Sequence, residues 1–362
     1  MGRIIKQTQI KTAVHYAHEN VIIENFQLSS LAKKYSLANF ATIEEFRQQT
    51  GLADLYWQAM YYRLPGQKKN LFQALGEVDG YIFFMHGWDG SHRIWEKLPL
   101  QLTLKHKRVI CFNLDVNGFG SSPFINDTPR PEQCSPAALM AAVEYWLSAV
   151  NLWPATYRRH KPFYLFVGHS MSGAATFYKD VSGWQDEAYG FYALAPALFC
   201  NDIQRQAFYK TVGLGIRIPS FTAIKDVLAP HVIDLLGTGA SPVVKNEHLR
   251  IYNQTPFGVI AQTLYVLGTA TTWPQRNDWS HFRIALGHRD RMVGLNSMLD
   301  LLEELDFHSH QIRINFGDHY FFSYGPGSPL SHKKNRQMLL KDLLDFCDEL
   351  TAKANQLLFN KN

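Results

Sequence analysis

The sequence predicts an α/β protein with a mostly parallel central sheet flanked by helices. Short, wholly apolar runs alternate along the chain with longer segments whose apolar residues recur at helical spacing. Parallel strands are buried on both faces, so they read as continuous hydrophobic runs without polar alternation. Hydrophobic residues make up 46% of the 362 residues and charged residues 19%, which is enough apolar material for a large buried core.

Apolar runs at intervals along the chain are the expected strands of this sheet. They are Tyr81–Met85, Arg108–Leu114, Phe163–Val167, Gly190–Leu194, Phe282–Leu286 and Gln311–Phe316. Two further strands are expected over Leu55–Leu64 and Asn70–Leu75, because Pro65-Gly66 between them is a turn dipeptide. Helices are expected between and after the runs, over Pro136–Leu152, Gly173–Val181, Leu295–Leu305 and Lys334–Leu358.

The spacing of these elements divides the chain into three parts. Residues 55–200 and 281–362 carry the alternating strands and helices and form the expected core. Residues 201–280 are too many for a loop, and they contain helical pieces at Ile203–Thr211, His248–Asn253 and Gly258–Leu267, so we expect an inserted helical cap or lid.

Residues 1–54 are polar and are expected to form a helical N-terminal extension. Thr42–Glu45 is a capping-box pattern, and Gly51 is a suitable helix stop. A faint helix-turn-helix pattern covers residues 31–49, but its basic face is too thin for reading DNA. We therefore expect this segment to pack on the core.

Composition excludes several classes of partner. The net charge is only +5 and no run of five or six like charges occurs, so no nucleic-acid partner is expected. The four cysteines lack metal-ligand spacing, so reduced thiols and no metal are expected. No apolar segment is long enough to span a bilayer and the first residues lack an export signal, which predicts a cytoplasmic protein.

The most informative motif is Gly168-His169-Ser170-Met171-Ser172-Gly173, which directly follows the apolar run Phe163–Val167 and precedes a helix. A serine on a sharp strand-to-helix turn leaves little room for neighbouring side chains, so Gly168 and Ser172 must be small. The more usual residue at position 172 is glycine; here Gly173 follows one place later. The pattern predicts a nucleophilic serine at Ser170.

With this motif the chain resembles the α/β-hydrolase family over about residues 55–350, and within it the monoacylglycerol-lipase, carboxylesterase and proline-aminopeptidase-like groups. The family places an acid and then a histidine after later strands. Asp290 follows the run Phe282–Leu286, and His319 follows the run Gln311–Phe316.

The resemblance implies a role for each of these residues. Ser170 is the nucleophile, His319 is the base that takes its proton, and Asp290 orients the imidazole. Asp202, soon after the run Gly190–Leu194, is the alternative acid, because some family members carry theirs at that place.

The run Tyr81–Met85 ends in His86-Gly87-Trp88, which resembles the family's His-Gly loop. The resemblance implies that the backbone N–H groups of Trp88 and Met171 form an oxyanion hole. His86 and His169 flank the expected site, and we expect both to serve local hydrogen bonding.

These residues predict a serine hydrolase that cleaves a carboxylic ester through an acyl-enzyme, with no cofactor. Apolar residues of the cap favour an apolar acyl or lipid-like small-molecule substrate, and a serine nucleophile does not favour haloalkane dehalogenase or epoxide hydrolase chemistry. A peptidase or amidase, a thioesterase and a C–C hydrolase use the same triad and remain alternatives, as does a non-catalytic binding protein of this fold. A peptidase that binds a free amino terminus needs carboxylates in the cap, for which Glu247 and Asp234 are the candidates. The oligomeric state is not predicted.

Overall fold

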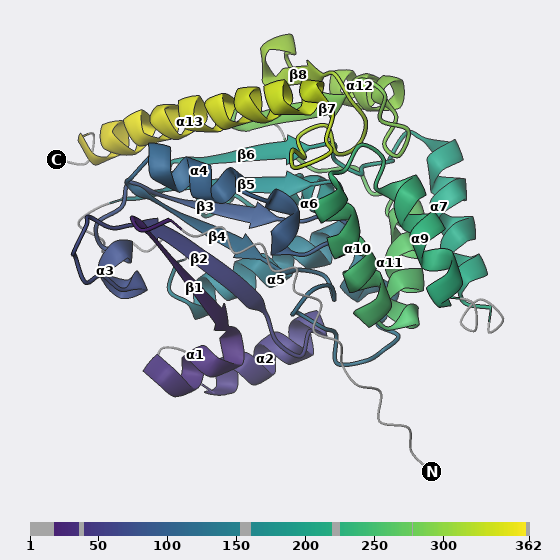
Figure 1. The fold of residues 1–362 in the computed structure, drawn as a ribbon, viewed down its shortest axis with the longest axis horizontal. Helices are drawn as coiled ribbons and strands as arrows, with labels where there is room; N and C mark the ends of the chain where they lie inside the picture. Colours follow the sequence, from purple (N-terminus) through teal and green to yellow (C-terminus); the bar gives the residue numbers. More distant parts are fainter. Residues whose placement is uncertain (1–17, 36–39, 153–160, 219–224, 277, 360–362) are drawn as a thin grey trace.

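The computed structural model describes residues 18–35, 40–152, 161–218, 225–276 and 278–359. Within these residues, eight strands form one sheet in the order β1-β2-β4-β3-β5-β6-β7-β8 (Figure 1). The strands are β1 (Val21–Gln27), β2 (Tyr56–Tyr62), β3 (Gly80–Met85), β4 (Val109–Leu114), β5 (Phe163–His169), β6 (Tyr189–Leu194), β7 (Phe282–Gly287) and β8 (Ile312–Asn315). Only β1 and β2 pair antiparallel with their neighbours, so the sheet is mostly parallel, as the apolar runs predicted.

Helices cover both faces of the sheet. Outside residues 201–280 they are α1 (Leu28–Tyr35), α2 (Phe40–Thr50), α3 (Leu71–Leu75), α4 (Leu98–Lys105), α5 (Pro136–Ala149), α6 (Met171–Thr176), α12 (Leu295–Glu304) and α13 (Leu330–Phe359). Short 3₁₀ turns lie at His92–Trp95, Pro131–Cys134 and Ser309–Gln311. Helices α4 and α13 pack on one face of the sheet, and α5 and α6 pack together on the other (Figure 1).

The expectation of a wholly helical N-terminal extension is wrong for part of residues 1–54. Val21–Gln27 forms the edge strand β1, which pairs antiparallel with β2 from Val21↔Tyr62 to Gln27↔Tyr56. The β-branched run Val21-Ile22-Ile23 favours a strand wherever a partner edge is free to pair with it. Helices α1 and α2 follow as expected, and Gly51, with φ +74°, ends α2. Residues 1–17 and 36–39 of this segment lie outside the described residues.

The expected strand at Asn70–Leu75 is also wrong, because Leu71–Leu75 is helix α3. The Asn70 side chain accepts a hydrogen bond of 3.0 Å from the Gln73 backbone N–H, and the Gln73 side chain accepts one of 3.0 Å from the Asn70 N–H. This reciprocal capping box starts a helix in a segment whose apolar content is equally compatible with a strand.

A row of phenylalanines crosses the middle of the sheet. In strand order its members are Phe112, Phe83, Phe166, Phe191 and Phe282, which are register partners on adjacent strands. Neighbouring rings stack with centroids 5.5, 4.9, 5.5 and 4.5 Å apart along this row. Such cross-strand aromatic contacts stabilise the pairing of strands.

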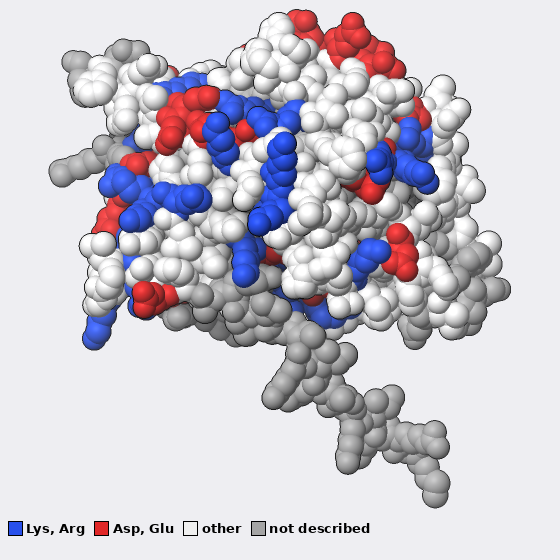
Figure 2. Space-filling model, turned by 45° about the horizontal axis from the view of Figure 1, so that its top comes forward, with Lys and Arg blue, Asp and Glu red and all other residues white. Residues whose placement is uncertain are grey.

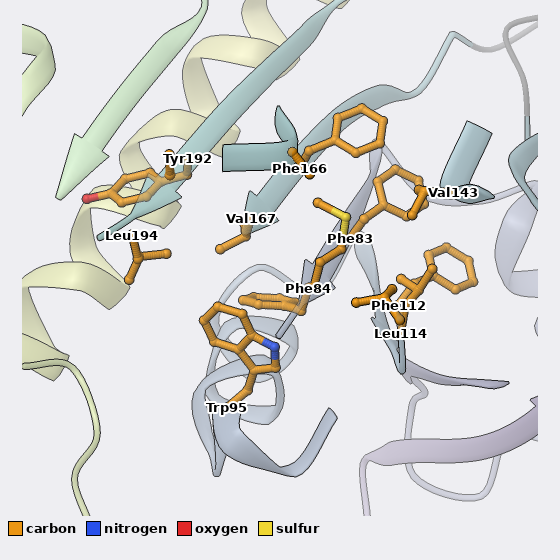
Figure 3. Close-up of a cluster of buried hydrophobic side chains, with 14 of the residues drawn as sticks. Phe83, Phe84, Trp95, Phe112, Leu114, Val143, Phe166, Val167, Tyr192 and Leu194 are labelled. Carbon is orange, nitrogen blue, oxygen red and sulfur yellow. The ribbon is translucent and has the colours of Figure 1, made fainter. Parts of the chain in front are cut away.

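Side chains from the two faces of the sheet separate into two clusters in Figure 3. Phe83, Phe112 and Phe166 lie with Val143 of α5 on one side, whereas Phe84, Val167 and Trp95 lie on the other. The alternation follows the period of two of a strand, and it explains why both faces of these strands are apolar.

Residues 201–280 contain four helices within the described ranges, at the end of the sheet toward which the parallel strands point (Figure 1). They are α7 (Ile203–Ile216), α9 (Lys225–Leu236), α10 (Pro242–Gln254) and α11 (Phe257–Thr269). Three of these helices were expected, and α9, which contains Pro230, was not. Helices α7 and α11 approach closely: a Cβ on Gly213 would lie 2.4 Å from the backbone nitrogen of Tyr265.

The surface carries both signs of charge. On the face drawn in Figure 2, Lys and Arg side chains lie next to Asp and Glu side chains, with uncharged areas between them. Among the described residues, no helix combines the length and apolar character needed to cross a membrane.

Candidate active site

Ser170 lies on a sharp turn between β5 and α6, at the carboxyl end of a central strand. Its backbone has φ 55° and ψ −115°, a conformation that costs a residue other than glycine about 1–3 kcal/mol. Gly168 is required by this turn, because a Cβ there would lie 2.3 Å from the carbonyl oxygen of Ser172. A Cβ on Gly173 would lie 3.1 Å from Cα of Pro196, so glycine also suits that position.

Ser172 occupies the place where glycine is more usual. Its hydroxyl donates a hydrogen bond to the backbone carbonyl of His86, at the end of the neighbouring strand β3. The departure from the usual motif therefore gives a bond between the serine turn and the loop after β3.

His319 and Asp290 come together from the loops after β8 and β7. Nδ1 of His319 lies 2.8 Å from Oδ2 of Asp290, and both residues are buried. The other carboxylate oxygen, Oδ1, accepts hydrogen bonds from the backbone N–H groups of Met292 at 2.9 Å and Val293 at 3.0 Å. A carboxylate in this position holds the imidazole with its proton on Nδ1, which leaves Nε2 as the basic nitrogen.

Ser170 and His319 line one small cavity of about 30 Å³. The rest of its lining comes from Trp88, Tyr209, Ile233, Gly237, His248, Leu264, Met292 and Tyr320. Five of these residues belong to the segment 201–280, so that segment closes over the serine. A cavity of this volume holds a water molecule and is far smaller than a pocket for a small organic ligand.

The loop after β3 passes directly beside the serine. A Cβ on Gly87 would lie 2.9 Å from Cβ of Ser170, so only glycine permits this approach. Trp88 lines the cavity, and its Nε1–H donates a hydrogen bond of 2.9 Å to Thr263 Oγ1 on α11. Met171 is the first residue of α6, so its N–H has no acceptor from a preceding helical turn. Both predicted oxyanion residues thus lie next to Ser170.

His86 is neutral and serves local hydrogen bonding. Its Nε2 accepts a bond of 2.9 Å from the Val116 N–H, and its Nδ1–H donates one of 2.7 Å to the Gly87 carbonyl. Burial lowers the pKa of His86 below its ordinary value. These bonds hold the turn that brings Gly87 beside Ser170.

His169, next to the serine in sequence, is also kept uncharged. Burial holds the pKa of His169 well below its ordinary value. Its Nε2 lies 3.3 Å from the backbone carbonyl of His319, and the two rings are 4.7 Å apart. The contact packs the histidine loop against the serine turn.

Asp202, the alternative acid, is engaged elsewhere. It caps the N-terminus of α7, where Oδ1 accepts a hydrogen bond of 2.9 Å from the Arg205 N–H, and Oδ2 pairs with the Arg205 guanidinium. Asp290, not Asp202, is the carboxylate bonded to His319.

Among the cavity residues that were not predicted from the sequence as site residues, His248 and Tyr320 are joined by a polar contact. The Tyr320 hydroxyl lies 2.7 Å from Nε2 of His248, and Nδ1 of His248 lies 2.6 Å from the backbone carbonyl of Asp89. Burial lowers the pKa of His248 to about 4. The position of Tyr320 next to His319 is a usable signal, whereas nothing in the sequence around His248 indicates that a cap helix places it there.

Among the described residues, no cluster of three or more His, Cys, Asp or Glu side chains could hold a metal ion. The two cap carboxylates considered for binding an amino terminus already pair with cations. Glu247 pairs with Arg250, and Asp234 lies 2.8 Å from Nζ of Lys245.

Solved structures with the same fold cover most of the chain. No family model matches the sequence, and no curated protein matches it. An esterase from Thermogutta terrifontis has a TM-score of 0.52 at 12% identity, over 82% of this chain and 94% of its own. An esterase from Exiguobacterium antarcticum has a TM-score of 0.53 at 10% identity, over 82% and 96%. An epoxide hydrolase of the α/β-hydrolase superfamily, from metagenomes of hot environments, has a TM-score of 0.50 at 13% identity, over 81% and 94%.

These similarities show the fold: the chain has the α/β-hydrolase fold. Esterases and an epoxide hydrolase share it, so the fold alone does not select a reaction.

Proposed function

We propose that this protein is a serine hydrolase that cleaves a carboxylic ester, with Ser170 as nucleophile, His319 as general base and Asp290 as the orienting acid. The observation that carries the proposal is the shared cavity of Ser170 and His319, together with the 2.8 Å contact between His319 and Asp290. A serine held in the strained turn conformation exposes its hydroxyl at a strand end, where a base can reach it.

The first half of the reaction forms an acyl-enzyme. Nε2 of neutral His319 accepts the proton of the Ser170 hydroxyl while Oγ attacks the ester carbonyl carbon. The carbonyl oxygen becomes an oxyanion, which accepts hydrogen bonds from the N–H groups of Trp88 and Met171. The bond from carbon to the alcohol oxygen then breaks, and imidazolium gives its proton to the departing alkoxide.

The second half of the reaction hydrolyses the acyl-enzyme, in which the acyl group is esterified to Ser170. Water replaces the alcohol, gives a proton to Nε2 of His319 and attacks the acyl carbon, and the new tetrahedral intermediate expels Ser170 Oγ. The carboxylic acid leaves and the serine regains its proton. Asp290 keeps its charge throughout and stabilises the imidazolium.

The apolar character of the cavity lining favours a substrate with an apolar acyl group. Ile233, Leu264 and Met292 supply aliphatic and thioether surface, and Tyr209 is buried beside them. Because the cavity is much smaller than an ester substrate, cap side chains or helices must move before a substrate enters.

Hydrolysis of amides, thioesters or carbon–carbon bonds uses the same three residues and is the alternative to ester cleavage. An aminopeptidase is disfavoured, because Glu247 and Asp234 are already paired with Arg250 and Lys245. A non-catalytic binding protein is the remaining alternative.

Labelling with a fluorophosphonate probe, followed by turnover of p-nitrophenyl esters of graded chain length, tests the proposal. The wild-type protein is expected to label and to hydrolyse these esters. Ser170→Ala should abolish both, whereas Ser182→Ala, which changes an exposed serine, should keep both. Absence of labelling and turnover in the wild type, or a Ser170→Ala variant that retains them, would overturn it.

A further inference from the structure

The cap holds the loop that carries the predicted oxyanion donor Trp88. His248 projects from helix α10 and lies 2.6 Å from the backbone carbonyl of Asp89, the residue after Trp88. Asp89 has φ 55°, a left-handed conformation that a non-glycine residue adopts only when its surroundings fix it. The contact from His248 is one of the interactions that fix it.

The hydrogen bonds of His248 define its protonation. A carbonyl oxygen can only accept, so Nδ1 of His248 must carry the proton that it shares with Asp89. In the neutral ring Nε2 is then an acceptor, and it accepts a hydrogen bond of 2.7 Å from the Tyr320 hydroxyl. His248 therefore contacts both the oxyanion loop and the residue next to His319.

Other bonds join the same loop to the cap. Trp88 Nε1–H donates to Thr263 on α11 at 2.9 Å, and the Ser91 hydroxyl donates to Glu247 on α10 at 2.5 Å. The bond from His248 differs from these because it acts on the backbone, and the backbone of this loop carries the N–H that must point at the substrate.

We propose that His248 is a positioning residue, which fixes the loop of Trp88 and Asp89 so that the Trp88 N–H points at the developing oxyanion. The inference rests on the proposed hydrolase function. On this proposal the cap contributes to the oxyanion hole indirectly. When α10 is packed against the core, His248 holds the Trp88 N–H in the orientation that stabilises the transition state. Loss of this positioning should lower kcat and leave KM unchanged, since the oxyanion exists in the transition state and not in the bound ester.

Two amide replacements separate the two bonds of His248. The side-chain nitrogen of asparagine reaches about as far as Nδ1, so His248→Asn can keep a donor to the Asp89 carbonyl. The side-chain amide of glutamine reaches about as far as Nε2, so His248→Gln keeps an acceptor for Tyr320 and loses the donor to Asp89. His231→Gln, on the exposed surface of α9, is the matched control.

The experiment measures kcat and KM on one p-nitrophenyl ester, together with the rate of fluorophosphonate labelling. Removing an oxyanion donor outright costs about 10²–10³-fold in kcat, so a displaced donor should cost about tenfold or more. We expect His248→Gln to lose this factor in kcat and in labelling rate at an unchanged KM. We expect His248→Asn to regain most of it, and His231→Gln to behave as wild type.

The possible outcomes separate the two proposals. Equal losses in both His248 variants, a loss confined to KM, or an unchanged kcat in His248→Gln would overturn the role of His248 alone. A wild-type protein that neither labels nor turns over substrate would overturn the proposed function and this inference together. If His248→Gln does not fold, His248→Ala, which also lacks the donor to the Asp89 carbonyl, must lower kcat at unchanged KM while His248→Asn does not, or the inference fails.

Discussion

Asp290 uses both oxygens of its carboxylate, one on the His319 ring and the other on its own loop. Oδ2 lies 2.8 Å from Nδ1 of His319, while Oδ1 accepts the N–H groups of Met292 and Val293. The backbone bonds prevent rotation of the carboxylate, so the direction in which the imidazole points is set by the loop after β7. The position of Asp290 is thereby coupled to the orientation of the His319 ring.

Asp290→Asn is expected to lower kcat by about 10³–10⁴-fold, because an amide donor facing Nδ1 favours the tautomer whose Nε2 already carries a proton. The measurement is kcat on a p-nitrophenyl ester. Asp202→Asn is the control: asparagine caps a helix about as well as aspartate, so this variant should keep the cap of α7 and leave turnover in place. The reverse ranking of these two variants would contradict the assignment of the acid.

Two glycines of α7 are expected to respond oppositely to alanine. A Cβ on Gly215 meets nothing within 4 Å, so Gly215→Ala should raise the free energy of unfolding by about 0.5–1 kcal/mol. A Cβ on Gly213 would lie 2.4 Å from the backbone of Tyr265, so Gly213→Ala must push α7 away from α11 and should cost about 1–3 kcal/mol. Denaturant unfolding measures both; equal effects would mean that the two helices are not in backbone contact.

Arg336 and Glu96 form a buried ion pair behind the cap. Glu96 Oε2 accepts from Arg336 Nη2 at 2.6 Å, and Oε1 accepts from the hydroxyl of Ser241, which caps α10, at 2.8 Å. Arg336→Met leaves the carboxylate buried without its cation and should cost about 3–5 kcal/mol of unfolding free energy. Adding Glu96→Gln should recover part of this loss.

An exposed ion pair provides the comparison. Arg108, whose side chain is 61% exposed, pairs with Asp79 at 2.5 Å, so Arg108→Met should cost less than about 1 kcal/mol. Similar losses for Arg108→Met and Arg336→Met would show that burial does not govern these pairs.

Acid should destabilise the fold through His248. Burial lowers the pKa of His248 to about 4, whereas in the unfolded chain the ring titrates near its ordinary value of about 6.5. Between these values the unfolded state binds more protons, so the free energy of unfolding falls as pH falls from about 6.5 to about 4. The contribution of this one group is on the order of 3 kcal/mol.

Comparing wild type with His248→Asn isolates this contribution, since His86 and His169 titrate in both proteins. The wild type should lose up to about 1.4 kcal/mol more per pH unit within the window, and the two curves should run parallel above it. Curves that stay parallel throughout would contradict a neutral, buried His248.

The sequence predicted the elements and residues that are marked by a pattern within a short stretch of neighbouring residues. Apolar runs identified β3 to β8. Ser170 was predicted from the motif after β5, and Asp290 and His319 from the resemblance to the α/β-hydrolase family; their catalytic roles stay predictions. Strand β1 was missed because Val21–Gln27 forms a strand by pairing with β2, and the pattern of residues within this segment does not indicate its partner.

Local signals also competed within single segments. In Asn70–Leu75 the capping residues Asn70 and Gln73 outweighed the turn at Pro65-Gly66 that had suggested a strand. Helix α9 was missed because Pro230 disfavours a helix interior, and tertiary packing overrides that preference here. The contact of His248 with Asp89 joins residues far apart in sequence, and no spacing rule encodes it.

The phenylalanine row has a consequence for the distances between residues of the candidate active site. Strand ends carry Trp88, Ser170, Asp290 and His319 on their following loops, so the alignment of the strands determines how far apart those groups lie. A slip of one residue moves a strand end by about 3.3 Å, more than the range over which a hydrogen bond survives, and turns every side chain of that strand to the opposite face. For β3 to β7 such a slip would also remove a ring from the stacked row. Stacked rings in the middle of the sheet therefore help to keep the distances at the proposed active site. Replacing Phe166, which does not line the cavity, by a smaller residue should broaden the distribution of those distances.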